Sequence, residues 1–170
     1  FTSSGTTATS ALVNDVAQRI TYRSDTPAGD ATVAVTVNDG AGGSASADVT
    51  VTSDTIYVTN ATDTATIDRS NGVSFSEAVA IAAADSTGSQ TIVFASSLAG
   101  QTLNLNAVSL NESLTFDMDQ ASGLVLTGGT LSLAGGTTQT FTNGSGDTAT
   151  ISSVVAGIGS LNKSGSGSLT

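Results

Sequence analysis

The sequence predicts an all-β protein with a hairpin in its first third, a short helix in its middle and a series of regularly spaced short strands after the helix. Three features of the 170-residue chain lead to this prediction. Apolar and polar residues alternate in many short runs, which is the pattern of strands with one buried face. From residue 100 onward the runs recur about every 8 to 11 residues, separated by glycine, asparagine or serine. One segment, residues 73–86, has the spacing and the capping residues of a helix.

The composition excludes several classes of function. The chain has 14 acidic and 4 basic residues and a formal net charge of −10, whereas a nucleic-acid partner requires a basic surface. It has no histidine and no cysteine, so zinc, copper and haem sites are not expected and disulfides are impossible. No apolar run is long enough to span a membrane, and no signal peptide starts at Phe1. We therefore expect an excerpt of a longer chain, with any export signal outside it.

Residues 31–51 predict a β-hairpin. Apolar residues occupy alternate positions on both sides of the turn NDGAGG, whose residues tolerate positive φ. These positions are Val33, Val35, Val37, Ala45, Ala47, Val49 and Val51. Upstream, Ile20 and Tyr22 in RITYRS predict a third strand, and Pro27 and Gly29 mark the turn after it. Three strands with one buried face are barely enough for a domain.

The hairpin resembles the last strands of the cadherin-like and immunoglobulin-like repeats of large bacterial surface proteins. The residues that match are Val37, Asn38, Asp39, Gly40, Gly42 and Gly43. The resemblance covers roughly residues 20–53 and implies that residues 1–53 are the C-terminal part of such a sandwich. A complete sandwich needs about seven strands. The remaining strands are expected from elsewhere in the protein or from another chain.

The segment VSFSEAVAIAAADS, residues 73–86, predicts the only substantial helix of the chain. Ser74 is followed three residues later by Glu77, which is the spacing of a capping box. The residues that share one apolar face are Phe75, Ala78, Val79 and Ala82. The sequence DSTG, residues 85–88, then ends the helix.

Residues 56–105 resemble the opening of the parallel β-helix of bacterial adhesins and polymorphic outer-membrane-type proteins. In that family a short helix of this kind precedes two strands. The matching residues are Ser74, Glu77, Ala78, Val79, Ile92, Phe94, Leu98, Gly100, Thr102 and Leu105. The departures are Phe75, Ser76 and Ala95, where the family usually has leucine, arginine and aspartate. The resemblance implies that residues 54–170 are the start of a right-handed parallel β-helix, with the helix covering its first coil.

After Gly100 the chain is a series of short alternating runs: TLNLN, SLTFDMD, LVLTGG, LSLAGG, TFTNG and TATISS. The positions that we expect to point inward are Leu103, Leu105, Leu114, Phe116, Met118, Leu124, Leu126, Leu131 and Leu133. An antiparallel meander is the other interpretation of this spacing. The scarcity of tight Asn-Gly turns and the many small residues favour stacked coils.

The last twenty residues, ISSVVAGIGSLNKSGSGSLT, resemble the passenger-associated repeat of autotransporters, which recurs coil after coil. The matching residues are Gly157, Gly159, Leu161, Lys163, Ser164, Gly165, Gly167 and Leu169. The resemblance implies that SLT begins a strand whose coil continues beyond Thr170.

The sharpest catalytic candidate is the pair Asp117 and Asp119. Two residues apart on a strand, their carboxylates would project from one face about 7 Å apart, near the separation used for inverting glycoside hydrolysis. Without histidine no Ser-His-Asp triad can be built. A solvated acidic pair is the simpler interpretation, and we expect a protein that is not an enzyme.

Calcium is the more credible ligand, because Asp and Asn oxygens are its usual donors. The candidates are Asn38, Asp39 and Asp54, near the predicted junction of the two segments. No complete calcium-binding loop is present, and Asp39 serves equally well as a turn residue.

Two classes of function remain. The first is a structural or adhesive stalk or filament of an exported bacterial cell-surface protein, extracellular, in which strands of the same protein or of neighbouring copies associate, with cell-surface carbohydrate as a further partner. The alternative is a carbohydrate-active β-helix whose active coil lies outside these residues. An ice-binding solenoid is a third and weaker hypothesis. Such proteins have regular ladders of outward-facing threonines, whereas the threonines here are irregularly spaced.

Overall fold

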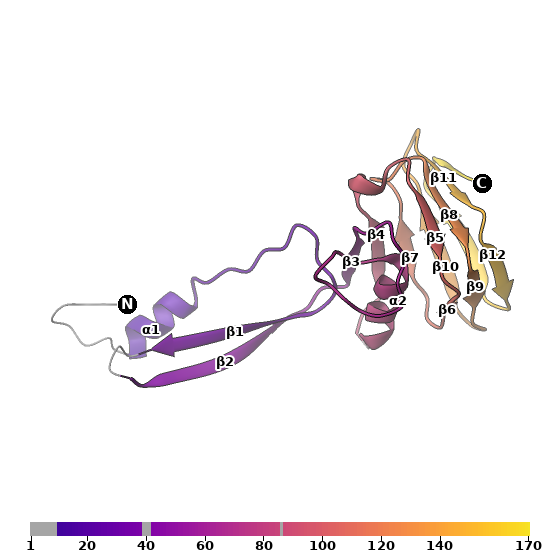
Figure 1. Ribbon diagram of the computed structural model, residues 1–170. Helices are drawn as coiled ribbons and strands as arrows, with labels where there is room; N and C mark the ends of the chain where they lie inside the picture. The colour runs from indigo at the N-terminus through magenta and orange to yellow at the C-terminus, as the bar shows by residue number, and fades with distance from the viewer. Residues whose placement is uncertain (1–9, 39–41, 86) are drawn as a thin grey trace. The chain divides into compact units, whose positions relative to one another are not determined.

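The structure is a computed structural model that describes residues 10–38, 42–85 and 87–170 (Figure 1). The chain forms two compact units. The hairpin unit consists of Phe1–Asp25 and Thr32–Val51, and the solenoid unit of Thr26–Ala31 and Thr52–Thr170. None of the helices in the described residues has the length and apolar character that crossing a membrane requires.

The hairpin unit contains the predicted antiparallel hairpin. Strand β1 (Ala31–Asn38) pairs with strand β2 (Ser44–Val51) in a two-stranded sheet. The alternation of valine with small polar residues therefore predicted this element correctly.

The strand predicted around Ile20 and Tyr22 is wrong. These residues follow helix α1 (Ser10–Ala17), which was not expected, and they form no strand. The helical hydrogen bonding continues past its end, because the Ile20 amide donates to the Ala17 carbonyl at 3.2 Å. An ion pair between Asp15 and Arg19, one helical turn apart at 3.2 Å, lies on the same segment. Two alternating apolar residues, Ile20 and Tyr22, are therefore too weak a signal to predict a strand beside a segment with helical hydrogen bonds. The prediction of a single substantial helix is also wrong.

The solenoid unit consists of short strands, the helix α2 (Phe75–Ala84) and the 3-10 helix η1 (Ser96–Leu98). In chain order its strands are β3 (Thr55–Val58), β4 (Thr91–Phe94), β5 (Thr102–Leu105), β6 (Val108–Leu110), β7 (Thr115–Asp117), β8 (Leu124–Gly128), β9 (Thr130–Leu133), β10 (Thr138–Thr142), β11 (Thr148–Ile151), β12 (Val154–Gly157), β13 (Ser160–Ser164) and β14 (Ser168–Leu169).

These strands form three parallel sheets. The orders are β13-β10-β7-β4-β3, β14-β11-β8-β5 and β12-β9-β6. Each turn of the chain, called a rung below, places one strand in each sheet: β4-β5-β6 in the first, β7-β8-β9 in the second and β10-β11-β12 in the third. With β13 and β14 beginning a fourth, residues 91–169 make a solenoid of about three turns.

The pairing confirms the stacked coils and contradicts the antiparallel meander. Ile92 lies beside Phe116, and Phe116 beside Phe141. We call such a line of paired positions, one from each rung, a row, and along this row one rung takes 24 or 25 residues. Partners in neighbouring parallel strands point to the same face of the sheet. Side chains that point inward in one rung therefore stack on inward side chains of the next. All nine positions expected to point inward between Leu103 and Leu133 are buried.

Stacked phenylalanines connect the rungs to α2. The ring centroids of Phe116 and Phe141 lie 4.7 Å apart, and those of Phe75 and Phe116 lie 5.7 Å apart. Phe94 completes the group at 6.0 Å from Phe75. Since Phe75 belongs to α2, the helix packs directly on the aromatic core of the rungs.

The capping box that predicted α2 is present. Ser74 is the N-cap, its Oγ accepts the amide of Glu77 at 3.4 Å, and Glu77 Oε2 accepts the amide of Ser74 at 2.8 Å. The buried face of the helix contains Ala78, Val79 and Ala82, as expected. The helix packs against β3 and β6 at the start of the solenoid.

The outer edge of β3 is covered by residues that precede the hairpin. The Tyr57 amide donates to the Pro27 carbonyl at 2.8 Å, and the Gly29 amide donates to the Thr55 carbonyl at 3.2 Å. Gly29 has φ +74°, and a Cβ there would lie 2.9 Å from Ile81 of α2. The first edge of this sheet is therefore paired and does not lie open.

Glycine is required where one rung passes close to the next. Gly157 has φ +110°, and a Cβ there would lie 2.1 Å from the Leu133 carbonyl oxygen. Gly165, with φ +77°, would place a Cβ 2.1 Å from the Asn143 carbonyl oxygen. Packing against the preceding rung therefore explains why Gly157 and Gly165, two of the positions that match the passenger-associated repeat, are glycine.

We predict that Ser74→Ala lowers the free energy of unfolding of the solenoid unit by about 1 kcal/mol, because the N-cap acceptor is lost. Ser74 is fully buried and its Oγ also donates to the Thr64 carbonyl at 3.0 Å. Chemical denaturation measures the change, with Ser89→Ala as the control because Ser89 is exposed. Equal losses in the two variants would show that the cap contributes nothing.

Candidate functional site

The most distinctive surface of the solenoid unit is its final edge. Strands β12, β13 and β14 each lie last in their sheets, so one side of every strand has no neighbouring strand among the described residues (Figure 1). We call this surface the open edge. Its large apolar side chains include Val154 (61% exposed), Val155 (43%), Ile158 (87%) and Leu161 (45%).

Two of these side chains belong to inward-facing rows. Val155 pairs with Leu131, which is 1% exposed, and Leu161 pairs with Gln139, which is fully buried. In parallel pairing, partners point to the same face of the sheet. Val155 and Leu161 therefore point as core residues do, and they are exposed because no further rung covers them.

Lys163 occupies the third inward row of the open edge. It pairs with Phe141, in a row that also contains Phe116 and Ile92. Its Nζ donates to the carbonyl oxygens of Ser164 at 3.1 Å and Gly165 at 2.6 Å. The lysine thus satisfies turn carbonyls at this edge. Inward-pointing charges at sheet edges also hinder indiscriminate pairing with foreign strands.

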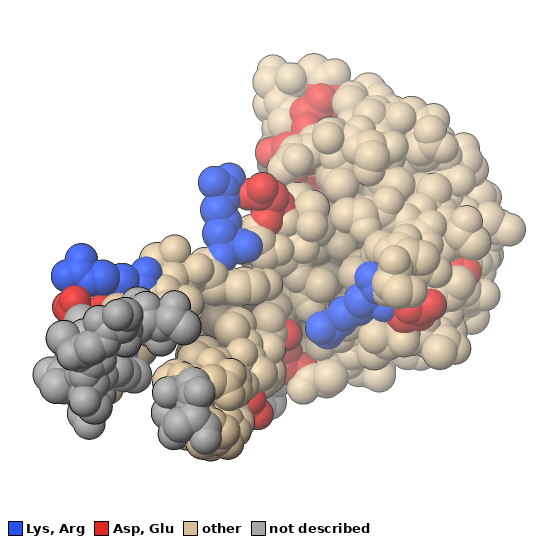
Figure 2. Space-filling model, turned by 60° about the vertical axis from the view of Figure 1, so that its left-hand side comes forward, with Lys and Arg blue, Asp and Glu red and all other residues tan. Residues whose placement is uncertain are grey.

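Charged side chains are sparse over the molecule. Most of the surface in the view of Figure 2 carries neither a basic nor an acidic group. The two ion pairs found among the described residues, Arg19–Asp15 and Arg23–Asp25, both lie on exposed side chains of the hairpin unit. Exposed pairs of this kind contribute little stability.

Buried carboxylates hold the start of α2 in place. Glu77 is 1% exposed, and its oxygens accept the amides of Ser74 and Asp68. Burial on its own raises the pKa of Glu77, but the hydrogen bonds from Asp68 and Ser74 together bring that pKa below its usual value. The stabilisation from this carboxylate is therefore present above its unfolded-state pKa and is lost as the pH falls through the folded-state value.

Asp63 connects three segments at the same place. Its carboxylate accepts the amide of Ser76 at 2.7 Å, the hydroxyl of Ser76 at 2.6 Å and the amide of Asn106 at 2.8 Å. Ser76, one of the departures from the adhesin pattern, thus makes a polar link to an aspartate where an arginine is usual in that family.

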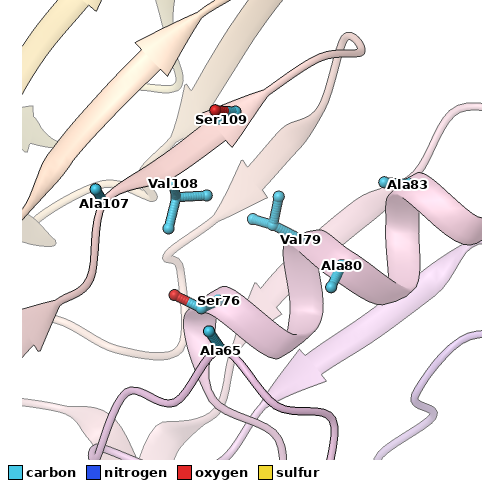
Figure 3. A pocket seen from close by; sticks show the side chains of 8 residues that line it. All are labelled: Ala65, Ser76, Val79, Ala80, Ala83, Ala107, Val108 and Ser109. Carbon is cyan, nitrogen blue, oxygen red and sulfur yellow. The ribbon is translucent and has the colours of Figure 1, made fainter.

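A small pocket of about 220 Å³ lies between α2 and β6. In Figure 3, Val79 of the helix and Val108 of the strand face each other across it. Alanines and the serines Ser76 and Ser109 make up the rest of the lining. The lining has no titratable side chain, so the pocket offers no group for acid–base chemistry.

The proposed catalytic pair is engaged in local structure. Asp117 Oδ1 accepts the backbone amide of Asp119 at 2.9 Å, which makes Asp117 a turn former at the end of β7.

The residues predicted to bind calcium fall in different parts of the chain. Asn38 ends β1 in the hairpin unit, Asp39 lies outside the described residues, and Asp54 belongs to the solenoid unit, where its carboxylate lies against Gly88. Calcium binding by Asn38, Asp39 and Asp54 therefore remains a prediction. Over residues 10–38, 42–85 and 87–170 no group of three or more Asp, Glu, His or Cys side chains is arranged to hold a metal.

Buried polar side chains that the sequence did not reveal lie beside the first rung. Gln90 is 2% exposed, and its Nε2 donates to Asp85 Oδ2 at 3.1 Å and to the Thr87 carbonyl at 2.7 Å. Burial, and then the charge of Asp85, raises the pKa of Glu112 above its usual value. Gln90 Oε1 and Glu112 Oε1 are both buried and accept no hydrogen bond.

The buried Gln139 occupies the next rung along from Glu112. Its Nε2 donates to the Glu112 carbonyl at 2.7 Å and its Oε1 accepts the Leu114 amide at 3.2 Å. Unlike Gln90, this glutamine has partners for both ends of its carboxamide. None of these residues stands at a spacing that marks a known motif, so sequence reasoning had no signal for them.

Comparison of the chain with models of protein families, with curated proteins and with solved structures finds no match.

Proposed function

We propose that this chain is a structural, adhesive segment of a long exported bacterial cell-surface protein, and that its solenoid continues as a stalk by stacking further rungs on the open edge. The observation that carries this proposal is the inward direction of Val155 and Leu161. They occupy core rows yet are 43% and 45% exposed. A further parallel rung would bury them.

The two ends of the solenoid differ, which supports growth in one direction. At the starting end Pro27 and Gly29 cover the edge of β3, and α2 packs against β3 and β6, whereas β12, β13 and β14 have no neighbour on one side among the described residues. A second copy of this chain cannot offer an uncovered β3 edge to the open edge. We therefore expect the covering rung to come from repeats of the same protein, wound right-handed as parallel crossovers generally are.

The hairpin unit supports a repeat-bearing stalk in a second way. Val37 of β1 and Val49 of β2 are 42% and 51% exposed, and within the part of the chain that the structure describes neither outer edge of the hairpin has a neighbouring strand. A two-stranded hairpin is marginally stable in water. We propose that further strands of the protein complete it as an immunoglobulin-like or cadherin-like repeat.

Sedimentation velocity tests the open edge. The chain alone is expected to associate as its concentration rises, because exposed strand edges recruit one another. The double variant Ile158→Lys/Leu161→Lys should sediment as a monomer with unchanged far-UV circular dichroism. The control is Ile67→Lys, since Ile67 is an equally apolar side chain, 48% exposed, that lies outside the open edge.

The control variant should associate like the unaltered chain. A chain that stays monomeric at every concentration would remove the main physical support for the proposal. Association that survives in the double variant would place the contact elsewhere and would contradict the role of this edge.

A further inference from the structure

The outer side of the five-stranded sheet carries an ordered set of hydroxyl groups. Alternate residues of β3, β4, β7, β10 and β13 point away from the buried phenylalanines of the core. Parallel pairing aligns one such residue from each strand in a single row across the sheet. We call it the central row, and four of its five residues are threonine: Thr55, Thr91, Thr115, Thr140 and Asn162.

Hydroxyl groups also lie on both sides of the central row. On β10, Thr138 and Thr142 flank Thr140 at alternate positions, so all three threonines point outward. The partners of Thr138 and Thr142 on β13 are Ser160 and Ser164. The hydroxyl groups therefore extend in two dimensions, across the strands and along them. We call the central row together with Thr138, Thr142, Ser160 and Ser164 the threonine face.

The spacing of the threonine face is regular in both directions. Neighbouring strands lie about 4.8 Å apart, and successive outward residues of one strand lie about 6.6 Å apart. On the inner side of β7 and β10, the ring centroids of Phe116 and Phe141 lie 4.7 Å apart, in agreement with this strand spacing. The threonines are irregularly spaced in the sequence because α2 and its loops separate β3 from β4. The register of the strands brings them into line.

The threonines of the central row are free to bind a ligand. Within the part of the chain that the structure describes, no hydrogen bond engages the hydroxyl groups of Thr55, Thr91, Thr115 and Thr140. By contrast, the hydroxyl group of Thr142 donates to the Phe116 carbonyl at 3.3 Å. The four free threonines are each half-buried along their row. Because threonine is also stiff at χ1, their hydroxyl groups are held in place before a ligand arrives.

The threonine face is uncharged. Each of its residues is threonine, serine or asparagine. The neighbouring carboxylate is that of Asp117, the partner of Thr142 on β7, and its Oδ1 accepts the Asp119 amide at 2.9 Å. Lys163 of β13 pairs with Phe141 and points to the opposite side of the sheet. The face therefore fits a neutral ligand that forms hydrogen bonds.

We propose that the threonine face binds the surface of ice. A ligand that meets all of these hydroxyl groups together must itself repeat in two dimensions at matching distances. The rows of oxygen atoms on the faces of an ice crystal repeat at distances close to those of the threonine face. Each hydroxyl group donates and accepts hydrogen bonds, as a water molecule does. Charged groups, which hold water in a different order, are absent from the face.

Crystalline polysaccharide is the other neutral ligand with a repeating surface. Sugar rings are usually held by aromatic side chains, but the threonine face has none and the chain has no tryptophan. These observations favour ice. Ice binding is compatible with a stalk, but it does not rest on the open edge or on any further rung.

The test uses the complete 170-residue chain. Osmometry on a single ice crystal measures the gap between the temperatures at which the crystal melts and grows, and slow freezing measures how much of the protein enters the ice. We expect the chain to open a measurable gap and to be enriched in the ice. Sedimentation with microcrystalline cellulose and with chitin is measured in parallel, and we expect the chain to stay in solution.

Thr140→Lys is the decisive variant, because it places a long charged side chain at the centre of the threonine face. We expect it to reduce the enrichment in ice by an order of magnitude, with unchanged far-UV circular dichroism. Thr138→Lys changes an exposed position of the same face and should have the same effect, which keeps the test valid if Thr140→Lys does not fold. Thr150→Lys is the matched control, since Thr150 is a half-buried outward threonine of β11 in another sheet.

The control should bind ice as the unaltered chain does. An unaltered chain that opens no gap and is excluded from the ice would overturn the proposal. Equal losses in Thr150→Lys and Thr140→Lys would overturn it too, because the binding would not belong to the threonine face. Binding to cellulose or chitin without binding to ice would reassign the face to polysaccharide and so contradict the proposal.

Discussion

Replacing Phe116 with alanine is expected to lower the free energy of unfolding of the solenoid unit by about 4 kcal/mol. Phe116 is fully buried, and its ring stacks between Phe141 at 4.7 Å and Phe75 at 5.7 Å. It therefore connects the helical cap to the second and third rungs. The parallel hydrogen bonds of β7 with β4 and β10 hold the backbone on both sides, so the cavity left by the ring cannot collapse fully.

Thr115→Ala is the control for this variant. Thr115 is the preceding residue of the same strand, it is half-buried, and it points away from the core. Its replacement should change the free energy of unfolding by less than about 1 kcal/mol. Denaturation in urea measures both variants. If Phe116→Ala costs no more than Thr115→Ala, the stacked aromatic core does not stabilise the rungs as the structure implies.

Much of the solenoid could be predicted because its signals are local. The Ser74–Glu77 spacing specifies a helix start through hydrogen bonds within four residues, and the structure contains both of them. Alternation of leucine with polar residues specifies which side chains point inward. Alternation does not distinguish parallel from antiparallel neighbours, because its period of two is the same in each. The choice of stacked coils depended on the small residues, and Gly157 shows why they are needed.

Other elements gave no sufficient signal. Strands β6 and β12 did not stand out, because VSL contains only two alternating apolar residues and VVAG does not alternate at all. Helix α1 has no capping pattern of the kind that marked α2, and it displaced the strand expected at Ile20 and Tyr22. The buried Gln90 and its partner Asp85 lie in the loop between α2 and β4, where no motif spacing marks them.

Adding a rung tests the ability of this fold to lengthen. Thr115 pairs with Thr140, and Leu124 pairs with Ala149, so both rows advance by 25 residues between the second and third rungs. A chain with residues 115–139 duplicated in tandem therefore keeps every native register and gains one rung. The inward side chains of the copy, equivalent to Phe116, Met118, Leu124, Leu126, Leu131 and Leu133, are all buried in the parent structure. In solenoids each rung adds its own stability and the interface with its neighbour.

Thermal unfolding of this duplicated chain is the measurement that tests the account most directly. We predict a single cooperative transition at a higher temperature, with the free energy of unfolding raised by roughly 3 kcal/mol, since several fully buried side chains are added and each contributes about 1.5–3 kcal/mol before the entropy of ordering the rung is subtracted. A matched insertion whose copies of Phe116, Leu126 and Leu133 are serine should instead lower the stability. A duplicated rung that is cleaved readily by protease, with a melting temperature at or below that of the parent chain, would contradict a solenoid that lengthens by stacking.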